Sequence, residues 1–201
     1  MRKLIVAAFV SLDGVMQAPG GPEEDPSNGF KFGGWMASIS DEVVGEAVGW
    51  LFQKPFELVL GRKTYDIFAG YWPQHGDHPI GKAFNATTKY VATRDPGLKL
   101  DWNNSHGLGA DPVAELKRLK AQDGPDLLTQ GSADFLQTLF AADIVDALQI
   151  ITFPVMLGAG KRLFQDGAAP RTWSLTEGKV TPSGALIGRY ARAGEIETGS
   201  F

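Results

Sequence analysis

The sequence predicts an α/β domain built on a mixed, mostly parallel sheet flanked by helices, and three observations support this prediction. Short apolar runs alternate with helix-type patterns along the chain, as in strands that are connected by helices. The length of 201 residues suits a single domain over residues 1–201 with a substantial core. Residues 172–191 contain no helix pattern, so the two strands expected there pair antiparallel at a sheet edge.

The composition is that of a folded, mildly acidic protein. Hydrophobic residues make up 43% and charged residues 21%, and the net charge of −4 argues against nucleic-acid binding, which needs a basic face. No apolar window reaches the roughly 20 residues that span a bilayer, so we expect a cytoplasmic protein without a membrane partner. The absence of cysteine excludes disulfides and thiolate chemistry. His75 and His78 lie in a Pro/Gly-rich loop without a third ligand, so no metal site is predicted.

The chain opens with a buried strand over Leu4–Val10, followed by a long loop over residues 11–34. The apolar run is short and is ended by Ser11-Leu12-Asp13-Gly14, which favours a strand over a signal peptide. The loop is rich in Gly and Pro, and long loops in compact domains are usually functional or mobile.

The later elements follow from the same patterns. Ser38 or Ser40 is expected to cap the first helix, and Asp41 and Glu42 lie in its first turn. In chain order we then expect a strand over Phe56–Leu60, a short helix over Lys63–Phe68, a strand over Lys89–Thr93, a helix that begins at Asp111-Pro112, a strand over Asp126–Thr129, a helix over Ala133–Ala141, a strand over Ala147–Phe153 and the two strands within residues 172–191.

Three predicted strands end in similar polar turns. These turns are Gly61-Arg62-Lys63-Thr64, Thr93-Arg94 and Gln130-Gly131-Ser132. In an open parallel sheet, ligands bind at the carboxyl ends of the strands. Two of the turns also lead into helices, whose first N–H groups are unpaired and carry partial positive charge, and Arg grips oxygen atoms two at a time. The combination predicts a ligand with several phosphates; the alternative is that each Gly merely ends a strand and each Arg is solvated.

The turn at Thr93 and Arg94 suits a further phosphate, on the adenosine ribose of a dinucleotide. A 2′-phosphate needs a cation and hydroxyl donors, whereas a free 2′-hydroxyl prefers an acid. The turn therefore predicts NADPH as the cofactor in preference to NADH.

These motifs, in this order, resemble the dihydrofolate reductase superfamily, and within it the C-terminal reductase domain of the riboflavin-biosynthesis deaminase/reductase. Residues 11–14 resemble the exit of that branch's first strand, and residues 61–64 its Gly-Arg-x-Thr phosphate turn. Residues 88–97 are similar to the strand that ends at the 2′-phosphate, and residues 143–164 are the most branch-specific segment. The resemblance implies a three-layer α/β/α fold of the dihydrofolate reductase type. It also implies NADPH binding by the three turns.

The catalytic acid is where this sequence departs from dihydrofolate reductases, which carry one acidic residue on the first helix to bind and help protonate the pterin. The corresponding place falls near Val43. Asp41, Glu42 and Glu46 flank it and are the candidate catalytic residues; the alternative is a helix start and a solvated face. The resemblance therefore supports the cofactor more than the substrate.

The substrate candidates are Asp13, Trp35, Asp66 and Thr152. Asp13 and Asp66 would either hydrogen-bond to a polar substrate or cap turns. Trp35 would either pack against a flat heterocycle or belong to the core. Thr152 lies near the place where the substrate pocket of the family meets the sheet.

Together these observations predict an NADPH-dependent oxidoreductase that transfers a hydride to a small heterocycle of pterin or pyrimidine type. One alternative is a stand-alone 5-amino-6-(5-phosphoribosylamino)uracil reductase of riboflavin biosynthesis. Another is a non-catalytic nucleotide-binding protein on the same scaffold. The expected assembly is a homodimer built on the edge strands.

Overall fold

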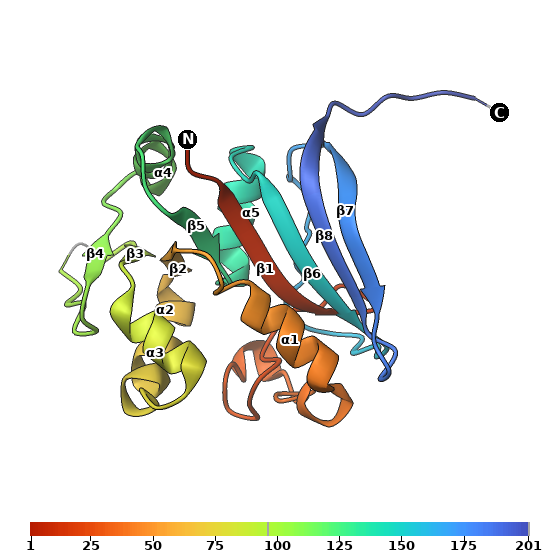
Figure 1. Cartoon of the computed structure of the whole chain (residues 1–201), viewed down its shortest axis with the longest axis horizontal. Helices are drawn as coiled ribbons and strands as arrows, with labels where there is room; N and C mark the ends of the chain where they lie inside the picture. Colours follow the sequence, from red (N-terminus) through yellow and green to blue (C-terminus); the bar gives the residue numbers. More distant parts are fainter. Residues whose placement is uncertain (96, 201) are drawn as a thin grey trace.

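An eight-stranded sheet with the order β4-β3-β2-β5-β1-β6-β8-β7 forms the centre of the molecule (Figure 1). The structure is a computed structural model that describes residues 1–95 and 97–200. Pro96, which belongs to the predicted turn after the third strand, lies outside the described residues.

In chain order the strands are β1 (Leu4–Ser11), β2 (Phe56–Gly61), β3 (Lys89–Ala92), β4 (Ser105–Gly107), β5 (Asp126–Thr129), β6 (Ala147–Phe153), β7 (Thr172–Val180) and β8 (Leu186–Gly194). The α-helices are α1 (Glu42–Trp50), α2 (Arg62–Tyr71), α3 (Pro79–Ala86), α4 (Pro112–Ala121) and α5 (Ala133–Ala141), and short 3-10 helices lie at Ser27–Gly29, Ala37–Ile39 and Trp72–Gln74.

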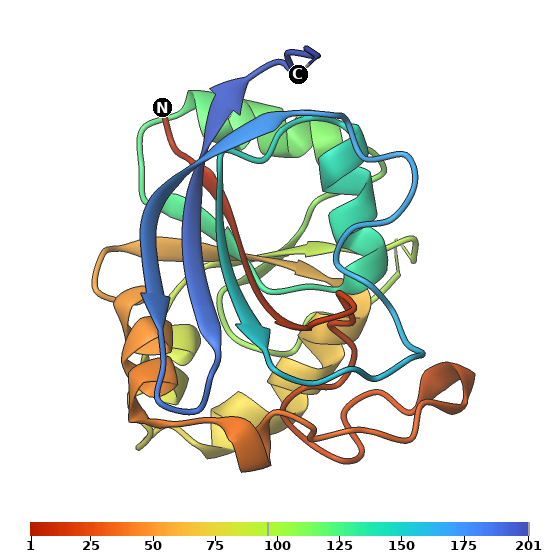
Figure 2. The same cartoon turned by 90° about the vertical axis from the view of Figure 1, so that its right-hand side faces the viewer.

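The pairing of the strands confirms the predicted mixed sheet. β1 pairs in parallel with β5 and β6, β2 with β5 and β3, and β3 with β4. β8 pairs antiparallel with both β6 and β7, and this hairpin forms one edge of the sheet (Figure 2). The carboxyl ends of β3, β2 and β5 therefore lie side by side at one edge of the parallel part.

Helices cover both faces of the sheet, which confirms the three-layer arrangement. On one face, Leu116 of α4 and Leu136 of α5 pack in one cluster with Val59 of β2. On the other face, Phe84 of α3 packs in a cluster with Leu58 of β2, and α1 and α2 lie on the same side. Leu58 and Val59 are neighbours on one strand and point to opposite faces, as strand geometry requires.

Several local predictions were wrong. The cap of α1 is Asp41, whose carboxylate accepts the N–H of Val44 at 2.9 Å, and not Ser38 or Ser40. The loop that contains His75 and His78 includes helix α3, which the sequence did not predict because its cap is a histidine, His78. Strand β4 was also missed, because it is only three residues long and lacks an apolar run.

Within residues 1–95 and 97–200, no helix is long and apolar enough to cross a bilayer. The same residues contain no group of three or more His, Asp or Glu side chains that could hold a metal ion.

Candidate functional site

The turns after β2 and β5 interlock at the carboxyl edge of the sheet. The N–H of Gly61 donates to the carbonyl of Gly131 at 3.0 Å. A Cβ on Gly61 would lie 2.2 Å from Ser132 Oγ and 2.7 Å from the Ser132 nitrogen, and a Cβ on Gly131 would lie 2.6 Å from Thr64 Oγ1. Glycine is therefore required at both positions for the two turns to approach this closely. Four of the predicted cofactor residues meet here, and the peptide between Gly131 and Ser132 is cis.

The helices that begin at these turns, α2 and α5, lack the side-chain caps that the other α-helices have. The capping position of α2 is Gly61, which has no side-chain acceptor. The capping position of α5 is Ser132, whose hydroxyl accepts no helix N–H. In contrast, Asp41, His78 and Asp111 cap α1, α3 and α4. Uncapped first turns present backbone donors and the positive end of the helix dipole, so this edge is suited to an anion.

The predicted turn Thr93-Arg94 lies next to the Gly61 turn, because Ala92 at the end of β3 is in register with Gly61. The Thr93 hydroxyl accepts the N–H of Asp95 at 3.1 Å, and Arg94 is exposed. All three predicted turns thus lie on adjacent strand ends.

The two cations of the first α2 turn are both engaged with carboxylates. Arg62 Nε donates to the two oxygens of Asp66 at 2.9 and 2.8 Å, in an exposed pair one helical turn apart. Exposed pairs of this kind contribute little, so the guanidinium can change partner. Lys63 instead pairs with Asp25 of the long loop, and Asp25 also accepts Lys161 Nζ at 2.9 Å.

Asp25 was not a predicted site residue, although it holds three segments together. Its side chain joins the long loop, the start of α2 and the segment after β6. Burial alone would raise the pKa of Asp25, but hydrogen bonds from Lys161, Lys63 and Ser27 hold that pKa below its ordinary value. Asp25 follows Glu23-Glu24 in a Gly/Pro-rich loop, and nothing in the sequence singles it out from these two acids.

A narrow cavity of about 10 Å³ lies beneath α1, beside the turn after β5. Val48 of α1 and Leu51, which follows the helix, line it on one side, Gln149 and Ile151 of β6 on the other, and Gln130 from the β5 turn. It also includes residues 7–9 of β1, and none of its lining residues is acidic. The space suits about one water molecule and is too small for a ring.

Gln149 fixes the wall of this cavity. It is buried, its amide nitrogen donates to the Ala47 carbonyl at 2.9 Å, and its oxygen accepts Arg189 Nε at 2.9 Å. Sequence reasoning passed over Gln149, although a glutamine inside an otherwise apolar strand is a usable signal, because a buried amide needs partners.

The candidate acids on α1 lie outside the cavity lining. Asp41 caps the helix and also accepts the Ser183 N–H at 2.8 Å. Burial alone would raise the pKa of Asp41, but hydrogen bonds from the Ser183 and Val44 N–H groups lower it to about 2, so the carboxylate stays ionised near neutral pH. Glu42 and Glu46 are exposed, and Glu46 lies 3.8 Å from Lys179 Nζ.

The substrate candidates Asp13 and Trp35 are engaged with neighbouring loops. Asp13 accepts the N–H groups of Leu157 and Gly158 at 3.1 and 2.9 Å. Its pKa is lowered to about 2, chiefly by the hydrogen bond from the Ser11 hydroxyl. Trp35 is buried, and its indole N–H donates to the Gln17 carbonyl.

The other two substrate candidates also lie outside the cavity lining. Asp66 pairs with Arg62, as described above. Thr152 alternates along β6 with Ile151 and Phe153, whose side chains pack on the α1 side. Its side chain therefore belongs to the opposite face of the sheet.

Comparisons with known proteins agree with this geometry. The family model of the RibD C-terminal domain matches residues 2–187. Two uncharacterized proteins of Bacillus subtilis (strain 168) are similar in sequence. YyaP is 27% identical over 174 residues, which cover 82% of this chain and 81% of YyaP. YwjB is 26% identical over 168 residues, which cover 82% of this chain and 84% of YwjB.

Solved structures share the fold. A protein of Shewanella sp. PV-4 assigned to riboflavin biosynthesis superposes with a TM-score of 0.61 and 18% identity, covering 95% of this chain and 99% of that one. Dihydrofolate reductase from Enterococcus faecalis, complexed with NADP(H) and RAB-propyl, has a TM-score of 0.59 and 14% identity, covering 94% and 96%. A pyrimidine reductase-like protein from Corynebacterium diphtheriae has a TM-score of 0.59 and 12% identity, covering 96% and 92%.

Proposed function

Because this chain belongs to the RibD C-terminal domain family, we propose that it is a reductase that uses NADPH to reduce a small heterocycle. The observation that carries the proposal is the meeting of two uncapped helix N-termini at the interlocked Gly61 and Gly131 turns. A side chain at either glycine would clash with the neighbouring turn. The unpaired N–H groups of the two first helical turns favour a ligand with adjacent negative charges.

Different residues at this edge of the sheet would hold different phosphates of NADPH. The first turns of α2 and α5, at Thr64 and Ser132, would hold the pyrophosphate. Thr93 and Arg94, one strand further along, would hold the 2′-phosphate, because Arg supplies charged donors that match a phosphate. Arg62 would join them by exchanging its exposed partner Asp66 for a phosphate oxygen.

We place the heterocycle on the α1 side of the sheet next to the coenzyme, where the cavity of about 10 Å³ would have to widen to admit a ring. Gln130 belongs to the turn after β5 and also lines the cavity, so the proposed phosphate site and the cavity are adjacent. When bound, NADPH supplies the hydride; the chain orients the two rings and excludes water. Since no acidic side chain lines the cavity, we expect a water molecule to deliver the proton.

The second candidate is the more specific reduction of 5-amino-6-(5-phosphoribosylamino)uracil. It is favoured by the family match and by the likeness to the riboflavin biosynthesis protein of Shewanella. A substrate screen separates the candidates: reduced coenzyme is mixed with the protein and with pterins, pyrimidines or this uracil derivative, and its oxidation is followed by absorbance.

We expect oxidation that depends on one heterocycle and on NADPH. Rapid turnover of the uracil derivative alone selects the riboflavin-pathway activity. Tight NADPH binding without turnover of any heterocycle contradicts the reductase proposal and favours a nucleotide-binding protein.

A further inference from the structure

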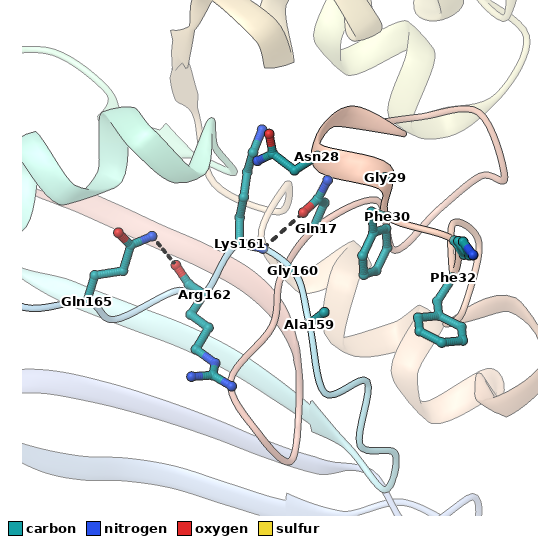
Figure 3. Close-up of a pocket in the computed structure, with 11 residues that line it drawn as sticks. Gln17, Asn28, Gly29, Phe30, Phe32, Ala159, Gly160, Lys161, Arg162 and Gln165 are labelled. Carbon is teal, nitrogen blue, oxygen red and sulfur yellow. Dashed lines mark hydrogen bonds between the residues drawn. The ribbon is translucent and has the colours of Figure 1, made fainter.

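A second and larger concavity lies between the long loop after β1 and the segment after β6 (Figure 3). It is an open cleft of about 550 Å³, within the usual size range of small-molecule sites. Its lining consists of Gln17, residues 28–32, residues 159–162 and Gln165, so it shares no residue with the turns at Gly61, Thr93 and Gln130.

The two walls of this cleft are fixed to each other by hydrogen bonds. The N–H of Met16 donates to the Lys161 carbonyl at 2.8 Å, and the N–H of Leu163 donates to the Gly14 carbonyl at 2.9 Å. The N–H of Lys161 donates to Gln17 Oε1 at 2.9 Å (Figure 3). Because backbone and side-chain bonds both cross between the walls, the cleft is largely pre-formed.

The charge of the lining is positive. Lys31, Lys161 and Arg162 line the cleft, and none of the lining residues is acidic. Lys161 is paired with Asp25, and Arg162 lies 3.7 Å from Asp13. Within the described residues no ion pair engages Lys31, which is exposed, so its charge is available to a ligand.

An aromatic surface stands beside these cations. Phe30 is buried, Phe32 is 51% exposed, and their ring centroids are 5.9 Å apart in an edge-to-face pair. Gly160 has a φ of +123°, and a Cβ there would lie 2.6 Å from Val15 and 2.9 Å from the Phe30 ring. Only glycine permits this approach, which brings the cationic segment against the aromatic wall.

We propose that this cleft is a binding site for a flat ring that carries an acidic group, such as a phosphate, sulfonate or carboxylate. The ring packs on the Phe30 and Phe32 side, and the acidic group lies toward Lys31 and Arg162. The cleft shares no residue with the coenzyme turns, although Lys161 of the cleft and Lys63 of α2 share Asp25. The proposed ligand is therefore additional to the coenzyme, and its binding is measured without the coenzyme.

The test uses a matched pair of fluorescent probes with one ring system. The first, 8-anilinonaphthalene-1-sulfonate, carries an acidic group, and the second, N-phenyl-1-naphthylamine, does not. Both are titrated into the full chain and into three variants. Lys31→Gln removes the available cation, Ala159→Leu fills the exposed cleft wall, and Lys117→Gln, on the exposed side of α4, is the control. Circular dichroism checks that each variant is folded.

We expect saturable binding of one sulfonate probe per chain. Lys31→Gln should weaken it roughly fivefold by removing a charge–charge contact, and Ala159→Leu should weaken it at least as much, while Lys117→Gln leaves it unchanged. The uncharged probe should be insensitive to Lys31→Gln.

Two results would overturn the proposal. One is sulfonate binding that is absent, unsaturable or unaffected by both cleft variants. The other is an equal loss of sulfonate binding in Arg94→Gln, because that would move the anion site to the coenzyme turns.

Discussion

The helix N-termini of this protein fall into two groups. Those of α1, α3 and α4 are capped by Asp41, His78 and Asp111. Those of α2 and α5 begin at Gly61 and Ser132 without a side-chain cap, and these two meet at one edge of the sheet. Glycine in place of a capping side chain costs only a few tenths of a kcal/mol, whereas a capping position with no favourable residue costs about 1 kcal/mol. This difference is what we expect if a bound anion takes the place of the missing caps.

The largest effect should come from a side chain between the uncapped ends. In Gly61→Ala, the new Cβ would meet the Ser132 nitrogen at 2.7 Å and Phe135 Cβ at 2.9 Å. Overpacking of this kind costs about 1–3 kcal/mol, and we expect coenzyme binding to be lost with it. Denaturant unfolding and calorimetric titration measure both effects.

The matched control is Gly45→Ala on the capped helix α1. A Cβ on Gly45 meets nothing within 4 Å, and alanine is the better helix former by about 1 kcal/mol. Gly45→Ala should therefore keep or raise stability. If both substitutions behave alike, close approach at Gly61 is not what shapes the site.

The next prediction compares the stability contributed by the two ion pairs in the first turn of α2. In Asp25→Asn, Lys63 and Lys161 lose their shared carboxylate, and the free energy of unfolding should fall by about 1–3 kcal/mol. Asp66→Asn breaks only the exposed Arg62 pair and should cost about 0.5 kcal/mol or less.

Limited proteolysis gives a local readout of the same pair. Cleavage within residues 11–34 should accelerate in Asp25→Asn and stay unchanged in Asp66→Asn. Equal cleavage rates in the two variants would mean that Asp25 does not hold the loop.

A smaller pair of substitutions tests the caps directly. Asp111→Ala removes a hydrogen bond to Ala114 N–H and should cost about 1 kcal/mol, with no effect on coenzyme affinity. Ser132→Ala removes no cap, so its stability cost should be below about 0.5 kcal/mol while coenzyme affinity falls. The reverse ranking in denaturant unfolding would contradict the division into capped and uncapped ends.

The smallest effect is a pH dependence of the free energy of unfolding that comes from Asp41, the cap of α1. The pKa of Asp41 in the folded protein, about 2, is below its ordinary value. Its contribution to stability is therefore complete above about pH 4 and is lost as the pH falls toward about 2. Unfolding measured across this range should be less pH-dependent in Asp41→Asn, whereas Ser132→Ala should keep the original profile.

The sequence predicted the three turns and every parallel strand except β4 because those signals are local. The apolar run of β2 stops at Gly61, and each polar turn follows directly. The cap of α3 by His78 could not be predicted, since histidine is not a preferred capping residue.

The cavity and the cleft depend on contacts between distant parts of the chain. Asp25 meets Lys161, and Gln149 meets Ala47, only after the chain has folded. Neither pair has a spacing that sequence periodicity can detect. The predicted acids at α1 illustrate the same limit, because their place at the start of the helix did not show that they lie outside the cavity lining.

The most direct test is calorimetric titration of the protein and of Arg94→Gln with NADPH and with NADH. We expect saturable NADPH binding, weaker NADH binding, and a loss of about tenfold or more in NADPH affinity for Arg94→Gln, as for one charged hydrogen bond, with little change for NADH. No heat with NADPH, or equal losses for the two coenzymes, would contradict the proposed coenzyme site.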